Sequence, residues 1–95
     1  MHAVIRHYSG KGAKELIDVI EKRKDEVKGI ITGIKGFVSY TCIRTSDGGY
    51  TMSVYQDKAG ADESLKRAKD WIQQNASNTG VGPPKISEGS VVLHA

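Results

Sequence analysis

Residues 36–57, GFVSYTCIRTSDGGYTMSVYQD, predict a β-hairpin. Two segments rich in Val, Ile, Thr, Tyr and Phe flank Asp47-Gly48-Gly49, whose glycines can supply the positive φ angles of a tight turn. With either Asp47-Gly48 or Gly48-Gly49 at the corner, alternation along the strands gives the same two faces. One face carries Phe37, Ser39, Thr41, Ile43, Tyr50, Met52 and Val54, and the other carries Val38, Tyr40, Cys42, Arg44, Thr51, Ser53 and Tyr55.

Both faces of this hairpin carry aromatic and apolar side chains. A sheet with one face in water alternates cleanly between apolar and polar residues, and this hairpin does not. We therefore expect both faces to be covered, by other parts of the chain or by a partner.

The segment before the hairpin predicts a strand and a helix. Residues 2–8 (HAVIRHY) are short and β-branched and are followed by Ser9-Gly10. Apolar residues then recur at helical spacing from Ala13 to Val27. Gly29 and Gly33 offer C-terminal stops for this helix. A short apolar connection to the hairpin is expected at Ile30, Ile31 and Ile34.

The segment after the hairpin predicts a second helix and a last strand. Asp57 is a suitable N-cap for a helix that runs to about Ala76. A strand is expected from about Lys85 to His94, with Gly89 as a bulge and residues 91–93 as its apolar part.

The resulting order, β-α-β-β-α-β, predicts a single ferredoxin-like α+β domain over residues 1–95. In this arrangement an antiparallel sheet has two helices on one face. The other face would still carry large apolar side chains, so we expect it to pack against the same face of a second copy. Two such sheets facing each other form a homodimeric α+β barrel.

Composition limits the other possibilities. A net charge of +3 comes from Lys and Arg that alternate with Asp and Glu along the helices, which indicates solvated helix faces and neither a nucleic-acid nor a membrane partner. Cys42 is the only cysteine, so no intrachain disulfide can form. We therefore expect a protein of the reducing cytoplasm.

Three local features add a family resemblance. They are the stretch Lys35-Gly36-Phe37-Val38, the Gly48-Gly49 hairpin, and an Asp-capped second helix that carries Trp71. With the length and the element order, they make the whole chain resemble the antibiotic-biosynthesis-monooxygenase-like proteins of the dimeric α+β barrel superfamily. The resemblance implies a homodimer with a pocket between the sheet and the second helix of each subunit. Some members oxidise polycyclic aromatic substrates with O₂ and no cofactor, and others bind and degrade haem.

The functional residues of the family correspond only in part. The family's second-helix tryptophan corresponds to Trp71. Arg67 stands where cofactor-free members have an asparagine one turn earlier, and His7 stands near the first-strand asparagine of haem-degrading members. No histidine lies between Trp71 and His94 to ligate haem. The resemblance therefore disfavours haem degradation and allows oxygenation without a cofactor, and we expect neither a cofactor nor a metal.

Six residues are the candidates for a site. His7 is the candidate catalytic residue, because a histidine can act as a general base near neutral pH. The candidate ligand-binding residues are Trp71, Arg67, Tyr40, Arg44 and Tyr55. Structural roles compete with each of these, since Trp71 borders the buried stripe of its helix and a strand histidine is usually structural. Together with Arg6, the strand arginines and tyrosines could orient an anionic or phenolic ligand.

Two classes of function follow, both with a small-molecule ligand. The first is a cofactor-independent monooxygenase that acts on an aromatic or polyketide-like molecule, and the alternative is a non-catalytic dimer that binds or senses a metabolite. RNA recognition is a distant third. RNA-recognition domains share the element order, but here the Lys35-Gly36-Phe37 motif opens the second strand, and Tyr50 and Tyr55 lie on opposite faces of the third.

Overall fold

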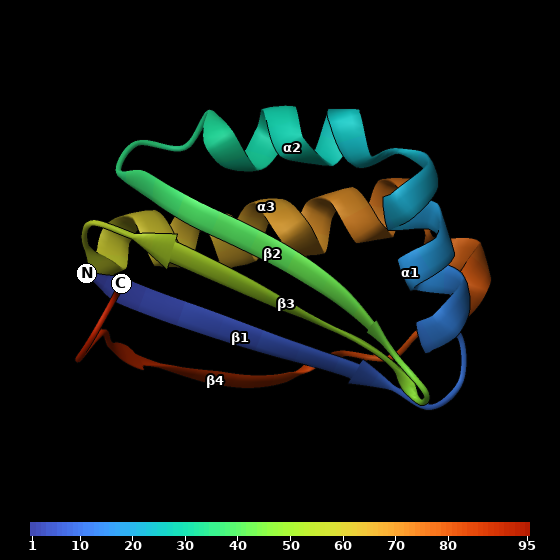
Figure 1. Cartoon of the computed structure of the whole chain (residues 1–95). Helices are drawn as coiled ribbons and strands as arrows, with labels where there is room; N and C mark the ends of the chain where they lie inside the picture. The colour runs from blue at the N-terminus through green and yellow to red at the C-terminus, as the bar shows by residue number, and fades with distance from the viewer.

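The computed structural model describes residues 1–95 and has the predicted ferredoxin-like order (Figure 1). The sheet is antiparallel throughout, with the strand order β2-β3-β1-β4. The three helices lie on one side of it. The elements are β1 His2–Ser9, α1 Ala13–Lys22, α2 Lys24–Thr32, β2 Phe37–Thr45, β3 Gly48–Tyr55, α3 Lys58–Asn75, a 3₁₀ turn Ser77–Thr79, and β4 Lys85–Ser90.

The core lies between the helices and one face of the sheet. Along β1 the buried residues alternate, with Val4, Arg6 and Tyr8 on the helix side. The helices contribute a continuous apolar stripe to the same layer, and its fully or largely buried members are Ala13, Leu16, Ile17, Ile20, Val27, Ile31, Ala61 and Trp71.

The hairpin turn lies one residue earlier than predicted. Thr45 pairs with Gly48, so Ser46 and Asp47 form the corner and Gly48 already belongs to β3. Gly48 has a φ of +147°, and a Cβ there would lie 2.3 Å from the Tyr8 carbonyl oxygen. The earlier corner keeps the predicted division into two faces, because the register moves by an even number of residues.

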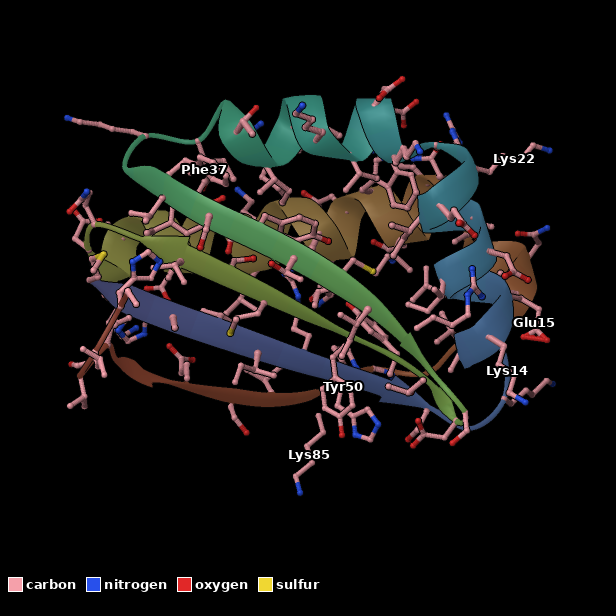
Figure 2. The ribbon with its side chains drawn as sticks, viewed as in Figure 1. Lys14, Glu15, Lys22, Phe37, Tyr50 and Lys85 are labelled. Atoms are coloured by element: carbon pink, nitrogen blue, oxygen red, sulfur yellow. The ribbon has the colours of Figure 1, made fainter.

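A β-bulge at the start of β2 reverses one predicted side chain. Phe37 pairs with Tyr55, but Ser39 pairs with Val54, so Val38 is the extra residue. Phe37 was predicted to share a face with Ser39. It lies instead beneath α2 (Figure 2), with its ring edge-on to that of Tyr55 at 5.9 Å.

The predicted first helix is two helices. The chain breaks at Arg23, whose φ of −114° and ψ of 31° lie outside the helical region, and α2 then continues to Thr32. The predicted stop at Gly29 and the connection at Ile30 and Ile31 were wrong. The apolar spacing continues through buried Val27 and Ile31, and the exposed Gly29 does not interrupt it.

The last strand is shorter than predicted. β4 ends at Ser90, which pairs with His2, and beyond this pair one backbone hydrogen bond joins the Val91 N–H to the Met1 carbonyl at 2.9 Å. Val92 and Leu93 are 99% and 87% exposed, and so they are not part of a strand core. Gly89 pairs directly with Ala3 with no shift of register, so the predicted bulge is absent.

The sheet face opposite the helices is uncovered, and we call it the open face. It is formed by Ala3, Ile5, His7, Ser39, Thr41, Ile43, Tyr50, Met52 and Val54, of which Val54 alone is buried by its neighbours, at 4% exposed. Three of its large apolar side chains are well exposed, with Ile5 at 37%, Met52 at 42% and Ile43 at 49%. The helices of one chain therefore cover one side only, as predicted. None of the helices combines the length and the apolar composition that crossing a lipid bilayer requires.

Asp57 caps α3 as predicted, and its removal gives a first testable result. Its side chain accepts a hydrogen bond from the Gly60 backbone N–H at 3.0 Å. We expect Asp57→Ala to lower the free energy of unfolding by about 1 kcal/mol in urea denaturation. Asp62→Ala, in the same helix, removes an exposed carboxylate and should have a smaller effect. An equal loss in both variants would contradict the capping role.

Candidate functional site

A small cavity lies between the sheet and the helices, beside Trp71, and we call it the central cavity. Its volume is about 30 Å³, enough for one or two water molecules. Its wall is formed by Arg6, Tyr8, Ile20, Val27, Ile30, Ile31, Tyr40, Thr51, Arg67, Ala68, Trp71 and Ile72. The wall is mostly apolar, and its polar groups come from strands β1, β2 and β3 and from α3.

Two open grooves share walls with the central cavity. The β4 groove, of about 740 Å³, runs between α3 and β4 and shares Arg6 and Tyr8 with the cavity. The α2 groove, of about 490 Å³, runs between α2 and β2 and shares Val27 and Tyr40 with it. The central cavity therefore lies between the two grooves and shares walls with both, and we call the three spaces together the hollow.

Arg6 is the most unusual polar residue of this region. Its side chain comes from the middle of β1 and is only 2% exposed. Nε donates to Thr51 Oγ1 at 2.8 Å, Nη2 donates to Ser53 Oγ at 3.3 Å, and Nη1 donates to the Ser64 carbonyl at 3.4 Å. No carboxylate of the chain forms an ion pair with it. A buried positive charge without a counterion is costly, so its presence in a cavity wall indicates a functional role.

Two tyrosines stand beside this charge. Both residues, Tyr8 and Tyr40, line the central cavity, and their hydroxyls make no hydrogen bond within the chain. Since no fully buried side-chain oxygen or nitrogen lacks a partner, these two hydroxyls are accessible from the cavity or the grooves. Burial raises the pKa of Tyr40 to about 12 and also raises the pKa of Tyr8, while the Arg6 guanidinium opposes both shifts. Both phenols therefore stay protonated at neutral pH and are available as hydrogen-bond donors.

Trp71 lines the central cavity from α3, and its indole N–H is hydrogen-bonded to a residue outside the cavity. Its Nε1–H donates to Glu26 Oε2, and this hydrogen bond is the main cause that lowers the pKa of Glu26. Arg23 links the same carboxylate to Asn75, with distances of 2.7 Å to Glu26 Oε1 and 2.6 Å to Asn75 Oδ1. Because the indole N–H is already bonded, Trp71 offers the cavity an apolar ring and no donor.

The structure brings together only some of the candidate site residues. Trp71, Tyr40 and Arg67 line the central cavity, although Arg67 is exposed and its Nε donates to Glu63 Oε1 at 2.8 Å. Arg44 lies outside, where it pairs with two carboxylates of α1 at 2.6 Å each. Tyr55 is fully buried in the core, and its hydroxyl donates to the Ile31 carbonyl at 2.9 Å.

His7, the candidate catalytic residue, lies on the open face and not in the cavity. Its ring stacks on Tyr50 with centroids 4.1 Å apart, and Nε2 is 3.1 Å from Asp47 Oδ2. Tyr50 is labelled on this side of the sheet in Figure 2. Sequence reasoning gave Arg6 only an accessory place, as a residue that could help to orient an anionic or phenolic ligand, and it left Tyr8 out of the site. The alternation in HAVIRHY could have identified them, since it places Arg6 and Tyr8 with Val4 and opposite His7.

No protein family model matches the sequence, and no curated protein is detectably similar to it. Solved structures do match its fold. The haem degrader MhuD from Mycobacterium tuberculosis, solved with two haems in its active site, has a TM-score of 0.68 and 16% identity, covering 100% of this chain and 99% of that chain. SnoaB, a cofactor-independent oxygenase from Streptomyces nogalater, gives 0.65 and 15%, covering 98% and 94%. A dimeric ferredoxin-like protein from an uncultured marine organism gives 0.63 and 12%, covering 99% and 94%. The fold is ferredoxin-like.

The walls of this ferredoxin-like fold are poorly suited to haem. Histidine, cysteine and methionine ligate haem iron in many proteins, and none of them lines the central cavity. Tyrosine can also ligate haem iron, as a phenolate, but burial raises the pKa of both Tyr8 and Tyr40 and so disfavours that form. Cys42 lines the α2 groove, where burial raises the pKa of its thiol and keeps it protonated. No group of three His, Cys, Asp or Glu side chains is placed to hold a metal ion.

Proposed function

We propose that this protein is a cytoplasmic, homodimeric, cofactor-independent monooxygenase of the antibiotic-biosynthesis-monooxygenase-like family. Its substrate would be a small aromatic or polyketide-like molecule held between the sheet and α3. One observation carries the proposal. Trp71 lines a hollow together with Arg6, Tyr8 and Tyr40, and no carboxylate of the chain pairs with any of these three polar residues. The fold shared with SnoaB, a cofactor-independent oxygenase, supports it.

The chemistry of this proposal follows from the electrostatics of the hollow. Dioxygen accepts electrons one at a time, so an organic substrate must first become an electron-rich enolate or phenolate. A buried cation favours that anion and also the superoxide that forms from dioxygen. In an anthrone, the methylene carbon then loses two hydrogens and gains one oxygen atom, and the second oxygen atom leaves as water. Arg6 would stabilise the anions, and Tyr8 and Tyr40 would donate hydrogen bonds to them.

The homodimer rests on the open face. Ile5, Ile43 and Met52 lie on neighbouring strands and are each more than one third exposed. A second copy turned by a twofold axis would cover the same residues on both subunits. The dimeric ferredoxin-like protein of the same fold supports this assembly.

A non-catalytic binding protein is the alternative, and one observation favours it. The wall of the central cavity contains neither a carboxylate nor a histidine. Because it holds no base of neutral pKa, a weakly acidic substrate such as an anthrone would have to lose its proton to water. Oxygenation therefore requires a substrate that ionises in the field of Arg6, whereas simple binding has no such requirement.

Oxygen consumption tests the proposal. With 1,8-dihydroxyanthrone in an oxygen electrode, we expect uptake above the uncatalysed rate, and we expect Tyr40→Phe to reduce it by at least about 10-fold, because one donor to the developing anion is lost. Tyr50→Phe removes the same hydroxyl from the open face and should leave the rate unchanged. Stabilisation of the fold by this compound without oxygen uptake would support the binding protein and contradict the monooxygenase.

A further inference from the structure

The charged residues that line the β4 groove are all positive. Buried Arg6 lines it from β1, and Lys66 and Lys69 line it from α3. None of the three forms an ion pair, and no aspartate or glutamate lines the groove. Elsewhere on the surface, each of the three other arginines is matched by a nearby carboxylate, in the Arg23–Glu26, Arg44–Asp18 and Arg67–Glu63 pairs.

The guanidinium of Arg6 has N–H donors that make no hydrogen bond within the chain. It carries five N–H donors, and three of them make hydrogen bonds within the chain. One N–H on each Nη nitrogen remains. Two such donors on neighbouring nitrogens suit the two oxygens of a carboxylate, or a phenolate next to a carbonyl group.

The rest of the β4 groove suits an apolar ring. Leu65 and Ile72 of α3 form one wall, and Ile86 of β4, which is 46% exposed, belongs to the other. Val81, Pro83 and Pro84 close the end where the chain enters β4. At about 740 Å³, this groove is far larger than the central cavity and is the part of the hollow that a ring system can occupy.

We propose that the β4 groove binds an aromatic monoanion, a carboxylate or phenolate, whose charged oxygens contact Arg6 and whose ring lies between α3 and β4. This deepens the proposed function, on which it rests for the location of the substrate, by naming the substrate as a compound ionised at neutral pH. An internucleotide phosphate does not fit this role, because a side chain only 2% exposed is out of reach of a polymer backbone.

A matched pair of ligands tests the charge requirement. The probes are 1-hydroxy-2-naphthoate and its neutral amide, 1-hydroxy-2-naphthamide, which have nearly the same shape. Binding is measured by calorimetry and by the fluorescence of Trp71, the only tryptophan in the chain. We expect the wild-type protein to bind the naphthoate about 30-fold more tightly than the amide, as a charge-assisted contact provides.

Three variants locate the charge that is responsible. Arg6→Met should reduce the preference for the naphthoate to less than about 3-fold, and Arg6→Lys should restore part of it. Arg44→Met is the control, because Arg44 is also a strand arginine on the helix side but pairs with Asp18 and Glu21 outside the grooves. It should keep the full preference. Circular dichroism establishes that each variant is folded.

The outcomes separate this inference from the proposed function. Equal affinities for naphthoate and amide in the wild-type protein, or an unchanged preference in folded Arg6→Met, would overturn the inference, whatever the oxygen electrode shows. Suppose that the preference for the naphthoate over the amide depends on Arg6, but that no phenolic or anthrone substrate gives oxygen uptake. This result would support the inference and would contradict the proposed monooxygenase activity. These measurements need binding only, so the two proposals can fail independently.

Discussion

Met52→Lys is expected to separate the proposed dimer into monomers. Met52 lies on β3 between Thr41 of β2 and Ile5 of β1, near the middle of the open face, and it is 42% exposed. A twofold axis through this face would bring the two new lysines close together in an apolar contact. Burying an unpaired charge there costs several kcal/mol, which corresponds to a dissociation constant raised by about 1,000-fold. Sedimentation velocity at micromolar concentration measures the change.

A control substitution on the other side of the sheet tests whether the effect is specific to the open face. Ile86→Lys changes an apolar side chain that is 46% exposed, but Ile86 lies on the helix side and lines the β4 groove. It should leave the dimer intact. If the wild-type protein is itself a well-folded monomer at micromolar concentration, the twofold assembly is wrong and the proposed family membership loses its main physical support.

The sheet could be predicted because side-chain alternation tolerates errors in the turn. The corner at Ser46 and Asp47 differs from both predicted corners, and yet Tyr40, Thr51 and Ser53 still share one face. A single β-bulge makes a prediction from side-chain alternation wrong for the residues before it. The extra residue at Val38 carries Phe37 to the opposite side, and nothing in the local residue types distinguishes that bulge from regular strand.

The candidate site could be predicted only in part, because residue type was weighed ahead of position. Trp71 and Tyr40 were expected at a pocket and line one. His7 was favoured for its proton chemistry, but alternation in β1 places it opposite Arg6, on the face without a cavity. That Arg6 would be buried without a carboxylate could not be read from the sequence, because it depends on which acidic residues of the helices come near it. Two of the three acidic residues of α1, Asp18 and Glu21, pair instead with Arg44.

Arg6→Met is expected to make the protein more stable when no ligand is added. Arg6 is a buried charge with no counterion, and two of its three hydrogen bonds are long, at 3.3 and 3.4 Å. The desolvation of such a charge costs several kcal/mol, and methionine fills a similar space with a flexible apolar chain. We expect a gain of about 2 kcal/mol, which raises the Tm of a domain this size by about 10 °C in a thermal melt followed by circular dichroism.

The direction of the change in Tm distinguishes a structural role of Arg6 from a role in anion binding. If the three hydrogen bonds of Arg6 stabilised the fold by more than the desolvation of its charge destabilises it, Arg6→Met would lower the Tm. Arg6 would then have a structural role. Arg44→Met provides the comparison, since it removes an exposed, ion-paired arginine and should change the Tm only slightly. A gain in stability joined to a loss of naphthoate binding would show that the fold bears an unfavourable charge in order to hold an anion. The same gain with binding unchanged would leave that charge without a function and would contradict the anion site.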